Sequence, residues 1–116
     1  MFKSLEEVTS TSKPKIFIDG RGGVVGAKIY GWLSERDDLE FLLIDPDKRR
    51  DVEERRRFLN AADLVLLCLP EDTAQQAVEL VENPKTRILD TSPAHRTQPD
   101  WVYGFAELLP GQRQRI

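Results

Sequence analysis

The sequence has 116 residues, enough for one domain with a hydrophobic core and too few for two ordinary domains. Hydrophobic residues make up 40% and charged residues 32%, a balance that argues against a disordered chain. The net charge is −3 and the basic residues are mixed with acids, so binding to nucleic acid by bulk electrostatics is not expected.

Residues 1–13 are polar and show little hydrophobic periodicity, which predicts a flexible leader before a domain at 14–116. Glu6 and Glu7 fall in this stretch, so it lacks the apolar core of a signal peptide. No apolar run approaches the roughly 18 residues of a membrane span. We therefore expect a cytoplasmic protein without a membrane partner.

The first regular pattern is an apolar run at 16–18, followed by a glycine cluster and a helical stretch to about Arg36. The pattern G-x-x-G-x-x-G, directly after a strand and at the opening of a helix, is a variant of the dinucleotide-binding fingerprint. Such a turn needs backbone angles closed to other residues, and it lets a pyrophosphate reach backbone N–H groups at the positive end of the helix. The cofactor-binding residues predicted here are Gly20, Gly23, Val24, Val25 and Gly26. The alternative is a tight turn that binds nothing.

A second apolar run, 41–44, ends at Asp45, 19 positions after Gly26, where an acid binds the adenosine ribose of NAD. Arg49 lies in the basic run 48–50, and an arginine near this point pairs with the 2′-phosphate of NADP. The residues alone leave NAD and NADP open. The basic run has the further alternative of only solvating the start of a helix.

A solvated helix is predicted after the basic run, because Val52 and Leu59 lie seven apart on one helical face of a charged segment. The third apolar run, 64–69, is hydrophobic throughout, as expected for a central parallel strand covered on both faces. Cys68 lies in this run without a basic neighbour, so we interpret it as a small hydrophobe rather than a nucleophile. It is the only cysteine, which excludes an internal disulfide, and no cluster has the spacing of a metal site.

Pro70 ends the third strand, and an amphipathic helix follows with Thr73 and Gln76 as its predicted cap. The apolar positions of this helix are Ala74, Ala77, Val78 and Val81. A fourth strand is predicted at 87–90. Strands alternating with helices predict an α/β fold, a Rossmann-like doubly wound parallel sheet of about four to five strands. Because a full dinucleotide-binding fold has six strands, we expect the chain to be part of a longer protein.

The loop at 90–96 follows the fourth strand at its carboxyl end, the edge where open α/β sheets bind ligands. Arg96 and Ser92 are suited to hold a phosphate through a charge-assisted hydrogen bond and a hydroxyl donor. The alternative is that Arg96 pairs with Asp90 to order the loop. His95 is the only histidine and has no visible partner, so we interpret it as structural rather than catalytic.

Four segments together resemble the shorter class of N-acetyl-gamma-glutamyl-phosphate reductases: 15–20 with its glycine turn, 67–72, 90–96 and 101–107. The most specific parts are Ala-His-Arg at 94–96 and Trp-Val-Tyr-Gly-Phe at 101–105, a segment we expect to pack as an apolar patch. The resemblance spans about residues 14–110, nearly the whole chain.

This resemblance implies NADPH-dependent reduction of the acyl phosphate N-acetyl-glutamyl 5-phosphate to the semialdehyde, with release of phosphate, in arginine synthesis. The family's catalytic cysteine belongs to a motif in a second domain beyond this chain, so no catalytic residue and no turnover are expected here. A homo-oligomer is expected for the intact enzyme. The binding residues implied are Gly20, Gly23 and Gly26 for the pyrophosphate, Leu69 and Pro70 for the cofactor cleft, and Ser92 and Arg96 for the substrate phosphate.

The glycine turn departs from the family's usual pattern. Members usually carry Glu-x-Gly-Thr-Thr-Gly after the first glycine, whereas this chain has Arg21 and, in place of the threonines, Val24 and Val25. Losing two hydroxyls that touch phosphate lowers cofactor affinity by about tenfold or more, which Arg21 offsets electrostatically. Two other functions remain open: a related enzyme acting on aspartyl phosphate, and a non-catalytic nucleotide-sensing module.

Overall fold

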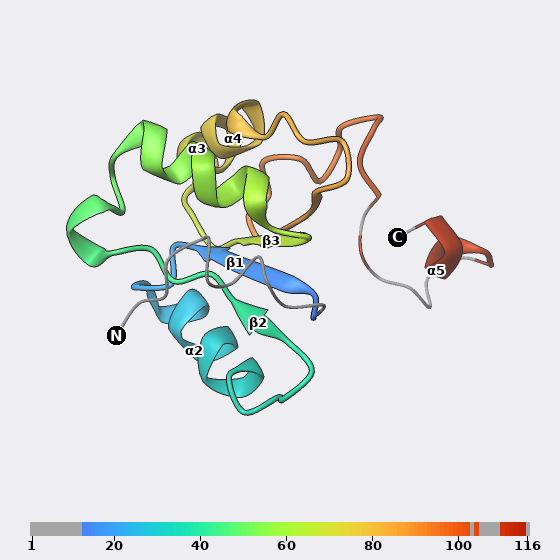
Figure 1. The fold of residues 1–116 in the computed structure, drawn as a ribbon. Coiled ribbons are helices and arrows are strands. Elements are labelled where there is room, and N and C mark those ends of the chain that lie inside the picture. Colours follow the sequence, from blue (N-terminus) through green and yellow to red (C-terminus); the bar gives the residue numbers. More distant parts are fainter. Residues whose placement is uncertain (1–12, 103, 105–109, 116) are drawn as a thin grey trace.

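Four parallel strands form the sheet of this protein, whose computed structural model describes residues 13–102, 104 and 110–115. Their order across the sheet is β2-β1-β3-β4 (Figure 1). The strands are β1 (Lys15–Asp19), β2 (Glu40–Phe41), β3 (Leu64–Leu67) and β4 (Arg87–Asp90). The predicted leader, except Lys13, lies outside the described residues, as do Tyr103 and Phe105 of the predicted apolar patch.

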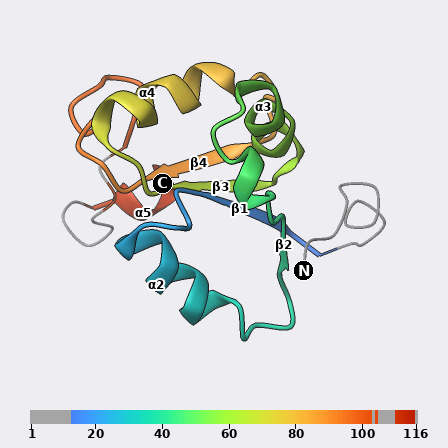
Figure 2. The same cartoon turned by 90° about the vertical axis from the view of Figure 1, so that its left-hand side faces the viewer.

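Helices cover both faces of the sheet, as the doubly wound prediction requires. In Figure 2, α2 lies on one face, and α3 and α4 lie together on the other. The helices are α2 (Val24–Leu33), the short 3-10 turn η1 (Pro46–Lys48), α3 (Val52–Ala61), α4 (Glu71–Leu80) and α5 (Gln112–Arg115). The prediction of a parallel α/β sheet is therefore confirmed.

The alternation of side chains along β1 divides the core into two layers. Ile16 and Ile18 join Leu66 of β3 in the cluster beneath α2. Phe17 points to the opposite face, where its ring packs on Phe58 of α3 at a centroid distance of 5.4 Å. Both faces of β1 are therefore covered, and Asp19 at its carboxyl end is buried as well.

Two strands are shorter than their apolar runs. The second was predicted at 41–44, but its ladder with β1 covers only Glu40 and Phe41; beyond these the Leu42 N–H still donates to the Ile16 carbonyl at 2.9 Å. The third was predicted to reach residue 69, but β3 ends at Leu67, because its partner β1 ends opposite at Asp19. Hydrophobicity marks burial, whereas ladder length depends on the neighbouring strand.

The predicted cap of the helix after the third strand was wrong. Thr73 and Gln76 do not cap α4: the helix begins at Glu71 after Pro70, whose carbonyl accepts from the Ala74 N–H at 2.8 Å. Two acidic residues in its first turn complement the helix dipole in place of a side-chain cap.

The charged helix is not wholly solvated, because Arg55 of α3 is buried with Phe58 and Leu59. Val52, which was predicted to share the apolar face with Leu59, is 40% exposed.

Candidate functional site

The glycine turn joins β1 to α2, where the sequence placed it, and two of its glycines are sterically required. Gly20 has a φ of +92°, and a Cβ there would lie 2.3 Å from the Cys68 carbonyl oxygen. A Cβ on Gly26 would lie 2.2 Å from the Gly20 carbonyl oxygen. Both obstacles are backbone atoms, so the turn packs against β3 and α2 only without side chains.

The start of α2 offers backbone donors in this turn. Its N-cap, Gly23, provides no side chain and donates its own N–H to the Gly20 carbonyl at 3.0 Å. The N–H groups of Val24, Val25 and Gly26 donate no hydrogen bond within the described part of the chain. Val24 and Val25 are 79% and 52% exposed and their side chains have no polar atom, so they can hydrogen-bond a ligand only through their backbone amides.

A cavity of about 630 Å³ opens beside this turn, at the carboxyl ends of β1 and β3; we call it the strand-end cavity. The glycine turn, the segment from Ile44 into the start of α3, and the start of α4 form its walls. Of the residues predicted to bind a cofactor, Gly20, Gly23, Arg49, Leu69 and Pro70 line it, whereas Val24, Val25, Gly26 and Asp45 do not.

The strand-end cavity carries an excess of positive charge. Among the described residues its lining contains one carboxylate, that of Asp19, and the four arginines Arg21, Arg49, Arg50 and Arg55. Arg21 also lies over the Tyr30 ring at 4.9 Å. A cavity of this charge at the edge of a parallel sheet is suited to a ligand with more than one phosphate.

Asp45 and Arg49 were predicted to contact the adenosine ribose and its 2′-phosphate. The Asp45 carboxylate accepts from the Asp47 N–H at 2.9 Å and so caps η1. Arg49, three residues beyond Pro46, reaches back across the cavity: its Nη1 atom lies 3.0 Å from where a Cβ on Gly22 would be. The structure thus brings Arg49 to the glycine turn, whereas the Asp45 carboxylate is engaged in capping η1.

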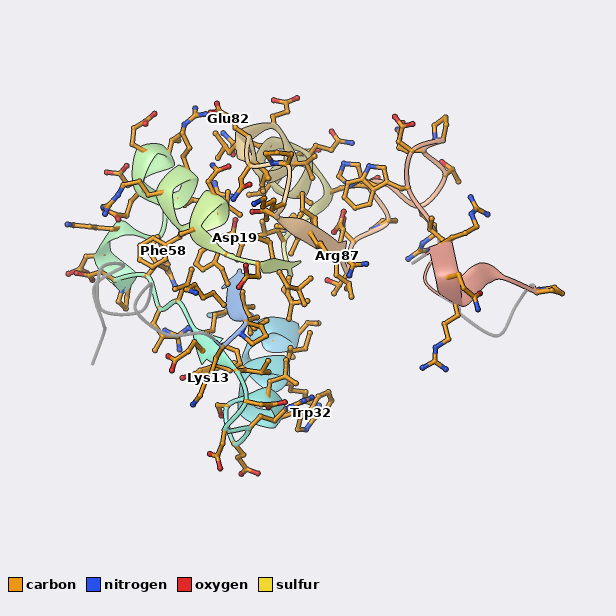
Figure 3. The ribbon with its side chains drawn as sticks, turned by 45° about the vertical axis from the view of Figure 1, so that its right-hand side comes forward. Lys13, Asp19, Trp32, Phe58, Glu82 and Arg87 are labelled. Carbon is orange, nitrogen blue, oxygen red and sulfur yellow. The ribbon has the colours of Figure 1, made fainter. Side chains whose placement is uncertain are left out.

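An ion pair that the sequence analysis missed forms part of the cavity wall. Nη2 of Arg55 donates to Oδ2 of Asp19 at 2.7 Å, and the two residues are 5% and 6% exposed (Asp19 is labelled in Figure 3). Burial raises the pKa of Asp19, and the Arg55 hydrogen bond and charge offset part of that rise. Two signals were present: Asp19 continues the core-facing alternation of Phe17, and Arg55 precedes Phe58 by three positions on one helical face.

The loop after β4 is organised around the Asp90 carboxylate. Oδ1 accepts from the Ser92 N–H at 2.9 Å, and Oδ2 lies 2.7 Å from Nδ1 of His95. The His95 ring stacks on Trp101 at a centroid distance of 4.2 Å. The view that His95 lacks a partner is therefore wrong, since the loop fold supplies one that is five positions away.

Comparison with known proteins gives two findings. Residues 44–115 match the protein family described as semialdehyde dehydrogenase, NAD binding domain. This chain belongs to that family. The matched range begins after the glycine turn, so the turn and the family match are separate observations that agree.

Proteins named N-acetyl-gamma-glutamyl-phosphate reductase are similar to this NAD-binding domain over 90% of its length. The relative from Trichormus variabilis is 53% identical and that from Brucella ovis 55%; a Nostoc relative named N-acetyl-gamma-glutamyl-phosphate reductase 2 is 52% identical. The chain spans about a third of the length of these relatives, 33% and 34% for the first two. No solved structure matches it.

In the structure of this semialdehyde dehydrogenase domain, the predicted site residues fall into two groups at different places. The glycine turn, Arg49, Leu69 and Pro70 meet at the strand-end cavity, whereas Ser92 and Arg96 lie in the β4 loop and are not part of the cavity lining.

In the described residues, no helix is long and apolar enough to cross a membrane, and no group of acidic, histidine or cysteine side chains is arranged to hold a metal ion.

Cys68 of this domain should react slowly with thiol reagents. Burial raises the pKa of its thiol and the carboxylates of Asp19 and Asp90 add to the rise, against a lowering hydrogen bond with Thr91. At pH 7.5 we therefore expect iodoacetamide to alkylate Cys68 several-fold more slowly than glutathione, because the thiolate is the reactive form. Mass spectrometry over time measures the rate, and unfolding in urea should restore it. A rate in the folded protein equal to that of glutathione would contradict a raised pKa for Cys68.

Proposed function

We propose that this chain is the NADP-binding domain of an N-acetyl-gamma-glutamyl-phosphate reductase, an enzyme that reduces N-acetyl-glutamyl 5-phosphate to the semialdehyde and releases phosphate. The observation that carries the proposal is the glycine turn beside the strand-end cavity, with three amide donors at the start of α2 that bind nothing among the described residues. The names of relatives that are more than half identical to the chain support the choice of substrate.

The charge of the cavity favours NADP over NAD. An acid at the end of the second strand would bind the ribose hydroxyls of NAD, but Asp45 does not line the cavity. Arg49 and Arg50 do line it, and the adenosine 2′-phosphate of NADP supplies the anion that such side chains bind.

The chain's own residues have binding roles in this proposal. The amides of Val24, Val25 and Gly26 hold the pyrophosphate, so the missing threonine hydroxyls weaken the site without removing it. When bound, NADPH supplies the hydride. Half-buried Cys68, with its raised pKa, does not attack the acyl phosphate, and the isolated chain is expected to show no turnover.

Ser92 and Arg96 are proposed to face the substrate phosphate. The Ser92 hydroxyl oxygen accepts from the Ala94 N–H at 3.2 Å, which leaves its own O–H as a donor. The Ser92 N–H and His95 both bind Asp90, and these contacts hold the loop in shape. The intact enzyme is proposed to be a homo-oligomer.

Calorimetric titration tests the cofactor assignment. We expect the chain to bind NADPH at least tenfold more tightly than NADH, and Arg49→Gln to lower NADPH affinity about tenfold with little change for NADH, because a charge-assisted hydrogen bond contributes about 1.5–3 kcal/mol. Arg36→Gln removes the same charge at an exposed site paired with Asp38, outside the cavity, and should change neither affinity.

Equal affinities for the two dinucleotides would overturn NADP specificity, and binding of neither would overturn the proposed function. Turnover of N-acetyl-glutamyl 5-phosphate by the chain itself would show that the nucleophile has been misassigned. A longer protein that contains this domain and prefers aspartyl phosphate would change the substrate but not the cofactor role.

A further inference from the structure

Arg55 lines the strand-end cavity and has hydrogen-bond donors that contact nothing else among the described residues. Its side chain is 6% exposed, and within that part of the chain Nη2 alone is engaged, with Asp19. Nε and Nη1 donate no hydrogen bond within the described residues. Buried donors of a charged group are normally satisfied, so these two call for a partner.

Stability alone does not explain the ion pair. Along β1 and α3, Phe17 packs on Phe58, and the next pair toward the cavity is Asp19 with Arg55. A second apolar pair at these positions would serve the core as well or better, because desolvating two charges costs about as much as their attraction returns. A buried charged pair at the wall of a ligand cavity is instead typical of a binding site.

The position and charge of Arg55 identify the chemistry of that partner. It lies on the segment after β2, as do Arg49 and Arg50, and among the described residues the cavity lining has four arginines and one carboxylate. Asp19 accepts from Nη2 and so holds the Arg55 guanidinium in a fixed orientation. Nη2 has two hydrogens, one parallel to Nε–H and the other parallel to an N–H of Nη1, so one pair of parallel donors stays open whichever hydrogen Asp19 accepts. Such a pair matches the oxygens of a phosphate.

We propose that Arg55 binds the 2′-phosphate on the adenosine half of NADP through the pair of guanidinium N–H groups that Asp19 leaves open, and that Asp19 is the positioning residue that holds Arg55 in place. This inference rests on the proposed function and adds to it. It assigns specificity for NADP to a buried, pre-oriented arginine on α3 in addition to Arg49 after β2.

Titration with adenosine 2′,5′-bisphosphate and adenosine 5′-monophosphate tests this inference without the nicotinamide half. We expect Arg55→Lys, which keeps a cation beside Asp19 but loses the fork, to weaken bisphosphate binding about tenfold and to leave monophosphate binding unchanged. Arg57→Gln is the matched control, since Arg57 lies on α3 but is exposed and paired with Glu54 outside the cavity.

Equal losses for both nucleotides would indicate a general structural role and overturn the inference. An unchanged preference for the bisphosphate in Arg55→Lys would overturn it too, while leaving the proposed function intact; failure of the wild-type chain to bind either nucleotide would sink the proposed function itself.

A measurement on the wild-type chain keeps the inference testable where Arg55→Lys does not fold. The guanidinium N–H NMR resonances of Arg55, assigned by labelling, should shift with the bisphosphate and not with the monophosphate. The absence of a shift at saturating bisphosphate would overturn the proposed contact.

Discussion

Replacing Gly20 with alanine is expected to destabilise the domain strongly. The residue has a φ of +92°, and the added Cβ would lie 2.3 Å from the Cys68 carbonyl oxygen in the backbone just after β3. Left-handed strain and overpacking together cost about 2–6 kcal/mol, a large part of the roughly 5–15 kcal/mol by which domains are stable. Urea denaturation followed by circular dichroism measures the loss.

Two other glycines supply controls for this substitution. A Cβ on Gly31, within α2, would meet nothing within 4 Å, so Gly31→Ala should raise stability by about 0.5–1 kcal/mol through helix propensity. A Cβ on Gly23 would make only an ordinary contact at 3.5 Å, so Gly23→Ala should fold normally. A Gly20→Ala protein as stable as these controls would show that the turn is not the tight crossing described above.

Removing Arg55 is expected to have the second large effect, because it leaves the Asp19 carboxylate buried without a partner. Arg55→Met should destabilise the domain by about 3–5 kcal/mol at neutral pH. The double substitution Asp19→Leu with Arg55→Met removes both charges and should restore most of the loss, since an apolar pair of similar volume is usually neutral or stabilising. Urea denaturation of both variants at pH 7 provides the comparison, and a double variant no more stable than the single one would contradict the explanation.

The loss caused by Arg55→Met should depend on pH. In the folded protein the pKa of Asp19 is raised above its ordinary value of 3.8, so the folded state holds this proton more tightly than the unfolded chain. The stabilisation from that proton is complete below 3.8 and is lost as the pH rises through the raised value. Without Arg55 the pKa rises further, so the deficit of the variant should be largest near neutral pH and shrink as the pH falls. A deficit that grows on acidification would contradict a lone buried carboxylate.

Sequence reasoning located the glycine turn and the strand-to-helix alternation because both have local causes. Gly20 must adopt a positive φ and Gly26 must leave room for the turn, and no other residue type does this at such spacing. The apolar runs around Phe17 and Val65 lie in strands that are covered on both faces. The resemblance to acyl-phosphate reductases also rested on contiguous motifs.

Sequence reasoning did not locate the polar contacts of the site, because these join residues far apart in the chain. Asp19 and Arg55 are 36 positions apart and meet only when α3 packs on the sheet beside β1. The contact of His95 with Asp90 forms only because the loop after β4 turns back toward the end of the strand. Charged residues in a polar segment are read as solvated by default, and a single buried member such as Arg55 does not alter that pattern.

The sequence by itself determined the class of this protein, an α/β domain with a glycine turn between its first strand and first helix, because strand burial, glycine conformation and helix periodicity are properties of short segments. Only the tertiary structure decided which charges face the strand-end cavity. Burial and ion pairing depend on which distant side chains exclude water from one another, and the folded backbone alone sets that arrangement.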